Sequence, residues 1–183
     1  MIRVVITGMG AITPLGNSVK EFWDNIVAGK SAAGPITKFD ASKFKTQFAC
    51  EVKGFNGENY FERKDLRKYD LFSQYAIAAV DEAVRDAGLD FSSFSDEQRS
   101  DFGVIWASGN GGIITFEEQL KEYYRGDGVP RFSPFFVPKR IEDIAAGIIS
   151  IRYQLYGPNY CTVSACASSN TAIINAFDTI RLG

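Results

Sequence analysis

The sequence predicts an α/β fold in which a sheet with parallel strands carries helices on its faces. Short runs rich in β-branched residues alternate with longer stretches whose apolar residues recur every three or four positions. This alternation repeats along all 183 residues, and βα repeats are typical of parallel sheets. Hydrophobic residues make up 45% of the chain and charged residues 23%, which is ordinary for an α/β protein.

The first strand is predicted at residues 3–7, where nearly every side chain is β-branched. Such a run indicates a strand buried on both faces. A helix is predicted over residues 19–28, with Ser18 as its N-cap and Glu21 completing a capping box. Gly29 is well placed to end this helix.

The rest of the chain continues the alternation. Further strands are expected at residues 47–52, 101–107 and 160–163. Helical spacing of apolar residues predicts helices at residues 71–87, 114–124, 140–155 and 167–182. Polar or proline-rich stretches indicate loops at residues 30–46, 90–100 and 126–138.

Charge, cysteine content and hydropathy narrow the class of protein. A net charge of −2 argues against a nucleic-acid binder. Three unevenly spaced cysteines do not suggest a disulfide framework, so a reducing, cytoplasmic setting is expected. Cys50 and Cys161 are interpreted as small core residues, and neither a metal site nor a cofactor is expected. No apolar run is long enough to predict a membrane span.

Cys166 is the strongest candidate for chemistry. It lies in a turn of small residues between a predicted strand and a predicted helix. A thiol at a helix N-terminus is expected to ionise more easily than a free cysteine, and a thiolate is a nucleophile. The usual proton-relay residue is missing, because the chain has no histidine. The alternative interpretation is a buried, inert cysteine.

Residues 108–112 form a glycine-rich segment, SGNGG, directly after a predicted strand. A tight strand-to-helix turn accounts for the glycines. A phosphate-binding loop is the weaker interpretation, because neither the Walker lysine nor the spacing of a dinucleotide-binding motif is present.

Two further segments could contact a partner. Residues 63–68 form the dense basic cluster of the chain; if they are helical, Lys64, Arg67 and Lys68 share one face. The ordinary alternative is a solvated helix face. Residues 133–138 place two aromatic rings in a proline-stiffened loop, where Phe136 is expected to anchor the loop on its own core.

Three stretches read in order carry a family resemblance: ITGMGAITPLGN, SPFFVPKRI and YGPNYCTVSACASSNTAI. Together they resemble the β-ketoacyl–acyl carrier protein synthases, in particular the elongating type II enzymes of bacterial fatty-acid synthesis. The resemblance implies a thiolase-like fold of two similar βαβαβαββ halves, each a mixed sheet with helices on both faces. It also implies that residues 1–183 are the N-terminal domain with the nucleophilic cysteine, the C-terminal half being absent.

The resemblance further implies an acyltransferase that performs a decarboxylative Claisen condensation. Cys166 would be the acylated nucleophile, and its backbone N–H would help to stabilise the oxyanion. Two histidines and a lysine that complete the site would lie in the second half, so the fragment alone is not expected to condense acyl groups. In the family, the position that matches Asn110 borders the acyl pocket and is often isoleucine.

The same resemblance implies the partners of the protein. The phenylalanine matching Phe135 reaches the pocket of a second subunit, so a homodimer is expected. The cluster of Lys64, Arg67 and Lys68 matches the docking site for acyl carrier protein, which is acidic and delivers both acyl and malonyl groups.

Two other functions stay open at this point. A degradative thiolase shares the fold and the cysteine but acts on coenzyme A; the SPFFVP loop and the late position of Cys166 favour the synthase. A non-catalytic module that binds carrier protein or scaffolds a dimer is the second alternative. The cysteine at position 166 favours a catalytic origin, because non-catalytic partners in related systems replace it.

Overall fold

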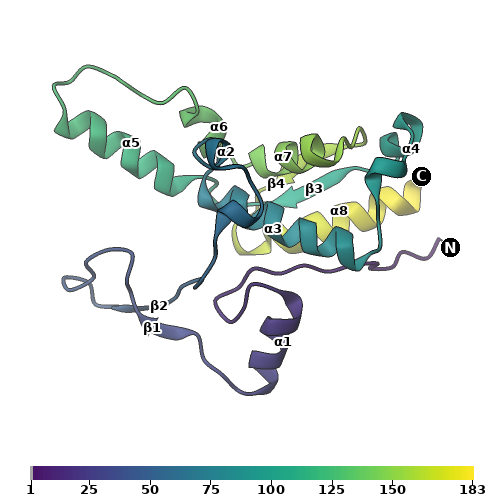
Figure 1. Cartoon of the computed structure of the whole chain (residues 1–183), viewed down its shortest axis with the longest axis horizontal. Coiled ribbons are helices and arrows are strands. Elements are labelled where there is room, and N and C mark those ends of the chain that lie inside the picture. Colours follow the sequence, from purple (N-terminus) through teal and green to yellow (C-terminus); the bar gives the residue numbers. More distant parts are fainter. Residues whose placement is uncertain (1) are drawn as a thin grey trace.

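The computed structural model describes residues 2–183. Figure 1 shows two parallel strands with helices on either side and two arms that extend away from them. The strands are β1 (Ala33–Pro35), β2 (Phe48–Cys50), β3 (Val104–Ala107) and β4 (Asn159–Thr162). The α-helices are α1 (Val19–Val27), α2 (Arg63–Leu66), α3 (Leu71–Asp86), α4 (Asp96–Ser100), α5 (Ile113–Arg125), α6 (Phe136–Arg140), α7 (Ile144–Tyr153) and α8 (Ser168–Leu182). The 3₁₀ turns are η1 (Gly57–Asn59), η2 (Phe91–Ser93) and η3 (Ala165–Ala167).

Strands β3 and β4 are the centre of the molecule. They pair in parallel, with Val104 opposite Asn159 and Ala107 opposite Thr162. Helices α7 and α8 both contact the strands, and Figure 1 shows them on opposite sides of the pair. The prediction of parallel strands with helices on both faces is therefore confirmed for this pair.

The core lies where α3 and α7 pack together above the strands. Ile77 of α3 is fully buried, and Ala146 and Ile149 of α7 are buried beside it. Phe91 and Leu155 belong to the same buried cluster. Helix α7 is apolar on nearly every side because it is covered by α3 on one face and by the strands on the other.

The predicted long helices are confirmed as α3, α5, α7 and α8, although α7 begins at Ile144 rather than near residue 140. The third predicted strand begins later than expected, at Val104. Gly103 packs so closely on the chain that a Cβ there would lie 2.6 Å from the carbonyl oxygen of Pro158. Within residues 2–183, no helix combines the length and hydrophobicity needed to span a membrane.

Helix α1 begins as predicted, with one difference at its cap. The Ser18 hydroxyl accepts the Glu21 N–H at 3.1 Å, which confirms Ser18 as N-cap. The Glu21 carboxylate accepts the N–H of Asn17 at 2.8 Å, one residue earlier than in a capping box. Gly29 follows the helix with φ of 67°, which glycine adopts at little cost.

The predicted strand at residues 3–7 is wrong for this structure, because the segment forms no regular secondary structure. Its apolar side chains stay in solvent, with Val5 57% and Ile6 82% exposed. A strand needs a neighbour to satisfy its backbone, and none pairs with this segment within residues 2–183. The following residues do pack: a Cβ on Gly10 would lie 1.8 Å from the carbonyl oxygen of Ala79 in α3.

Three segments predicted as loops contain short elements, namely residues 30–46, 90–100 and 126–138. The first holds β1, which pairs antiparallel with β2, and the last holds the start of α6. In the second, the Asp90 carboxylate caps η2 by accepting the Ser92 N–H at 3.0 Å. Ser95 and Gln98 then form a reciprocal capping box that begins α4.

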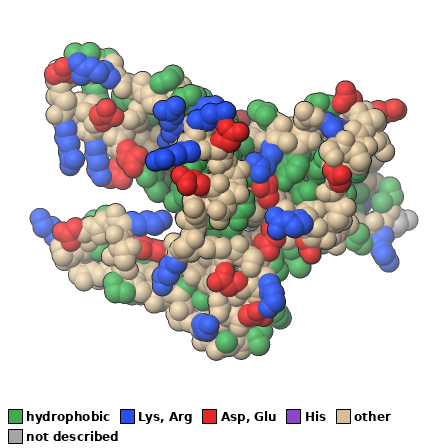
Figure 2. Space-filling model, viewed as in Figure 1, with side chains coloured by type: hydrophobic (Ala, Val, Ile, Leu, Met, Phe, Trp, Pro, Cys, Tyr) green, Lys and Arg blue, Asp and Glu red, His purple; other side chains and the backbone are tan. Residues whose placement is uncertain are grey.

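Two arms leave the body of the molecule. One is α5 with the loop that returns to α6, and the other is the hairpin of β1 and β2. Figure 2 shows a hollow between these arms, with Lys and Arg side chains along both. Short α2 lies at the base of the α5 arm in Figure 1.

Candidate active site

The chain between β4 and α8 makes a tight turn held by small polar side chains. Thr162 is buried, and its hydroxyl donates to the carbonyl oxygen of Ser168 at 2.9 Å. The Ser168 hydroxyl donates to the Ala165 carbonyl at 2.7 Å and accepts the Ser164 N–H at 2.8 Å. These bonds fix both ends of the turn that contains Cys166.

Cys166 is presented at the tip of this turn. Ala165 before it has φ of 49°, a left-handed conformation that costs a residue with a Cβ about 1 kcal/mol. Cys166 is an exposed, free thiol, unlike the buried cysteine of the alternative interpretation. Ala167 is the N-cap of α8 and supplies no side-chain cap, and the Ser168 N–H donates to the carbonyl oxygen of Ala165. The start of a helix carries partial positive charge and favours an anion nearby.

The sequence pattern singled out Cys166 but not the residues that hold its turn. Ser168 and Thr162 could have been found from their hydroxyls flanking a cysteine, because Ser and Thr side chains commonly bond to nearby backbone. Nothing in the sequence signals the left-handed Ala165, since alanine normally avoids that region.

The other two cysteines have different surroundings. Cys50 is exposed on β2, so its predicted place in the core is wrong; the hairpin is too thin to cover it. Cys161 is half-buried on β4. Burial, with a smaller contribution from the charges of Asp143 and Glu142, raises the pKa of the Cys161 thiol. Only Cys166 joins exposure with a position at the start of a long helix.

The glycine-rich segment 108–112 is a tight strand-to-helix turn, as its simpler interpretation predicted. The Gly111 N–H donates to the Ser108 hydroxyl at 3.0 Å. The Gly112 N–H donates to the carbonyl oxygen of Arg140 at 3.0 Å, which ties the turn to the end of α6. Asn110 is exposed on this turn. Because β3 and β4 are parallel, Asn110 and Cys166 both follow the carboxyl end of the strand pair.

The two phenylalanines of the proline-rich loop behave differently. The Phe136 ring stacks on Phe132 at 5.2 Å and on Phe116 at 6.1 Å between ring centroids, which confirms it as an anchor on its own chain. Phe135 is half-buried and makes no ring-to-ring contact within residues 2–183. Its N–H donates to the Ser133 hydroxyl at 3.2 Å, which fixes its backbone at the start of α6.

The basic cluster is less uniform than its sequence predicts. Helix α2 ends at Leu66, so Lys68 lies beyond it and the expected single helical face does not form. The Lys64 ammonium lies 2.7 Å from Glu62, whose hydrogen bond and charge raise the pKa of that lysine. The Lys68 ammonium pairs with Asp65 at 2.5 Å, and this hydrogen bond lowers the pKa of the aspartate.

Arg67 is the exception in this cluster. It is exposed, and no carboxylate lies within ion-pair distance of it in the part of the chain that the structure describes. Its Nε donates to the carbonyl oxygen of Lys64 at 3.3 Å, which holds the exposed guanidinium at the end of α2. Arg67 therefore carries the uncompensated charge of the segment.

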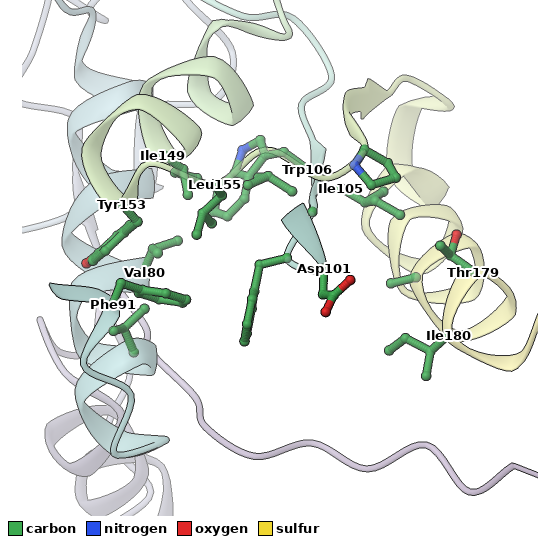
Figure 3. A pocket seen from close by; sticks show the side chains of 16 residues that line it. Val80, Phe91, Asp101, Ile105, Trp106, Ile149, Tyr153, Leu155, Thr179 and Ile180 are labelled. Atoms are coloured by element: carbon green, nitrogen blue, oxygen red, sulfur yellow. The ribbon is translucent and has the colours of Figure 1, made fainter. Parts of the chain in front are cut away.

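An apolar cavity of about 550 Å³ opens beside β3, away from Cys166. Figure 3 shows Val80, Ile149 and Tyr153 from α3 and α7 on one side of β3, and Thr179 and Ile180 of α8 on the other. The cavity thus follows the edge of β3 that β4 does not cover. None of the predicted site residues lines it.

Residues 1–183 match the family model described as "Beta-ketoacyl synthase, N-terminal domain" along their entire length. The chain belongs to the β-ketoacyl synthase family. The match covers the strained cysteine turn, the glycine-rich turn and the aromatic loop of this ketoacyl synthase chain in a single alignment.

Curated relatives agree with this assignment. The chain is 43% identical over 182 residues to 3-oxoacyl-[acyl-carrier-protein] synthase 2 of Staphylococcus aureus (strain MRSA252), covering 100% of this chain and 43% of that protein. It is 38% identical over 181 residues to the protein of the same name from Synechocystis, covering 99% and 42%. The ketoacyl synthase chain thus spans about 43% of the length of the relatives it matches.

Solved structures confirm the predicted thiolase-like fold. A β-ketoacyl synthase from Burkholderia phymatum matches with a TM-score of 0.78 and 29% identity, covering 100% of this chain and 44% of that one. A type II polyketide ketosynthase bound to its acyl-carrier protein matches with a TM-score of 0.80 and 23% identity, covering 98% and 46%. The second likeness concerns the fold alone.

Proposed function

We propose that this chain supplies the nucleophile-bearing half of a β-ketoacyl–acyl carrier protein synthase active in fatty-acid elongation. The observation that supports this most directly is the exposed Cys166 at the tip of a strained turn before α8, in a chain of this family. Strain beside a reactive group is common where the backbone must present a side chain for chemistry.

The proposed reaction has two stages. In the first, the Cys166 sulfur attacks the thioester carbon of an acyl carrier, a C–S bond forms, and the carrier thiolate leaves and takes up a proton. In the second, a malonyl carrier loses carbon dioxide, and the resulting carbanion attacks the acyl-cysteine. A C–C bond forms as the Cys166 thiolate departs. The N–H of Cys166, close to the positive end of α8, is suited to the oxyanion of each tetrahedral intermediate.

The chain lacks the groups that would assist the second stage. Decarboxylation needs hydrogen-bond donors to the enolate oxygen, and this role commonly falls to histidine. The 183 residues contain no histidine. We therefore expect the chain by itself to accept an acyl group but not to complete the condensation.

The neighbouring residues have proposed roles in substrate binding. Asn110 and Cys166 both follow the carboxyl end of the strand pair, which supports a place for Asn110 at the mouth of an acyl pocket. Phe135 is free of the aromatic stack that holds Phe136, which supports a role at the interface of a homodimer. Arg67 with Lys64 and Lys68 is the proposed docking site for an acidic acyl carrier protein.

A cytoplasmic location belongs to the same proposal. All three cysteines are free thiols, and exposed thiols such as those of Cys50 and Cys166 persist in a reducing compartment.

Acyl transfer to Cys166 is the decisive test. The complete protein would be incubated with an acyl-loaded carrier and digested, and the acylated peptide would be located by mass spectrometry. The mass increase should fall on the peptide with Cys166 and vanish in Cys166→Ala. Cys50→Ala is the matched control, because it removes another exposed thiol and should leave the label in place. Labelling that survives Cys166→Ala would refute the assignment.

A further inference from the structure

Asp70 joins the starts of two helices that are far apart in sequence. Its carboxylate is buried, with the residue only 6% exposed. One oxygen accepts the Phe72 N–H at 3.3 Å and so caps α3. The other oxygen accepts both the N–H of Thr115, at 3.1 Å, and its hydroxyl. Thr115 is also buried and lies 45 residues away, in the first turn of α5.

The start of α5 has no cap of its own. Its N-cap is Gly112, which has no side chain with which to accept an N–H. Helix starts leave N–H groups unsatisfied and carry partial positive charge, so an anion there is stabilising. Asp70 serves α5 as a cap supplied from another helix, and a single carboxylate satisfies two helix starts.

The glycine-rich turn leads directly into the helix start that Asp70 caps. Helix α5 begins where residues 108–112 end, and the turn is bonded on its other side to the carbonyl oxygen of Arg140. The position of Asn110 therefore depends on both attachments. A Cβ on Gly112 would lie 2.0 Å from the Lys139 carbonyl oxygen, so the turn already packs closely against α6. Loss of the Asp70 attachment would let the turn move the other way.

We propose that Asp70 is a positioning residue that sets the length of acyl chain the enzyme accepts, by fixing the turn that carries Asn110. The inference rests on the proposed function, because it assumes that this turn borders the acyl pocket. Asp70 itself is buried and acts through Thr115 and α5.

Asp70→Asn is the test variant. It keeps the size of the side chain but replaces one acceptor oxygen by an NH₂ group, which donates and cannot accept an N–H, so the two helix starts can no longer both be capped. Thr115→Val removes one of the two bonds and keeps the N–H, so a smaller effect of the same kind is expected. Asp90→Asn is the matched control, because Asp90 also caps a helical turn but lies exposed on η2.

Hydrogen exchange in the complete protein gives the first readout. Asp70→Asn should reduce protection of the amides in the first turn of α5 roughly tenfold, the effect of losing one cap. Protection in α8 should stay unchanged in both Asp70→Asn and Asp90→Asn. Equal loss of protection in α5 and α8 would mean general destabilisation and would overturn the proposal, as would no change in α5.

The ratio of kcat/KM for a long and a short acyl substrate gives the second readout. General destabilisation lowers both values equally and leaves their ratio unchanged. A displaced pocket mouth should shift the ratio roughly tenfold, as expected for a change in the fit of one or two methylenes. An unchanged ratio in Asp70→Asn overturns the proposal. Absence of acyl transfer in the unaltered protein overturns the proposed function itself and is seen before any variant is measured.

Discussion

Ser168→Ala tests whether the cysteine turn depends on its internal brace. The buried Ser168 hydroxyl makes two short hydrogen bonds, at 2.7 and 2.8 Å, to the backbone of the turn. Each such bond contributes about 0.5–1.5 kcal/mol net. Water can replace the lost partners of Ser164 and Ala165, because both residues are exposed. The expected loss of unfolding free energy is therefore about 1–2 kcal/mol, not the larger cost of buried unsatisfied groups.

A functional effect should accompany the loss of stability. Without the brace, the left-handed Ala165 relaxes and Cys166 is no longer held at one place, so its acylation should slow about tenfold or more. Urea unfolding and the rate of acyl transfer would be measured on Ser168→Ala and on Ser169→Ala. Ser169 is the adjacent, exposed serine and is the matched control. Equal stability and equal acylation rates in the two variants would refute this account of the turn.

Four further outcomes are expected. Arg67→Glu should raise the KM for acyl carrier and weaken its salt dependence, measured by steady-state kinetics, whereas Lys20→Glu, at an exposed lysine of α1, should not. Ile77→Ala should lower the urea-unfolding free energy by about 3–4 kcal/mol, because the side chain is fully buried. Gly112→Ala should destabilise by more than 1 kcal/mol and lower the thermal midpoint, because its Cβ meets backbone. Burial and the hydrogen bond to an aspartate raise the pKa of Tyr153 to about 12. The protonated tyrosine therefore contributes about 1 kcal/mol of unfolding free energy after solvent screening, which is complete below pH 10 and is lost as pH rises through 12. Tyr153→Phe should remove this loss of unfolding free energy between pH 10 and pH 12, measured by urea unfolding at each pH.

Local patterns were sufficient for much of the fold. The spacing of apolar residues predicts the helices α3, α5, α7 and α8. The alternation of helices with strands along the chain predicts the parallel pair β3–β4. The position of Cys166 between β4 and α8 follows from the same pattern. These features depend on residues close in sequence.

The features that escaped prediction depend on residues far apart. Residues 3–7 have the composition of a buried strand, but a strand forms only beside a partner, and none is paired with them within residues 2–183. The bond between Asp70 and Thr115 joins positions 45 residues apart, which no local pattern encodes. The pairing of Lys64 and Lys68 with neighbouring acids depends on where α2 ends, and helix ends are the least certain part of any sequence pattern.

The open edge of β3 bears on how the chain behaves at high concentration. Within the described residues β3 pairs with β4 alone, and unpaired backbone groups along a strand are a template for another strand. The apolar side chains of Val5 and Ile6 are exposed in a segment that has no strand partner. We therefore expect the 183-residue chain to self-associate as its concentration rises. The aggregation behaviour of the chain in solution will then depend on which segment pairs with β3.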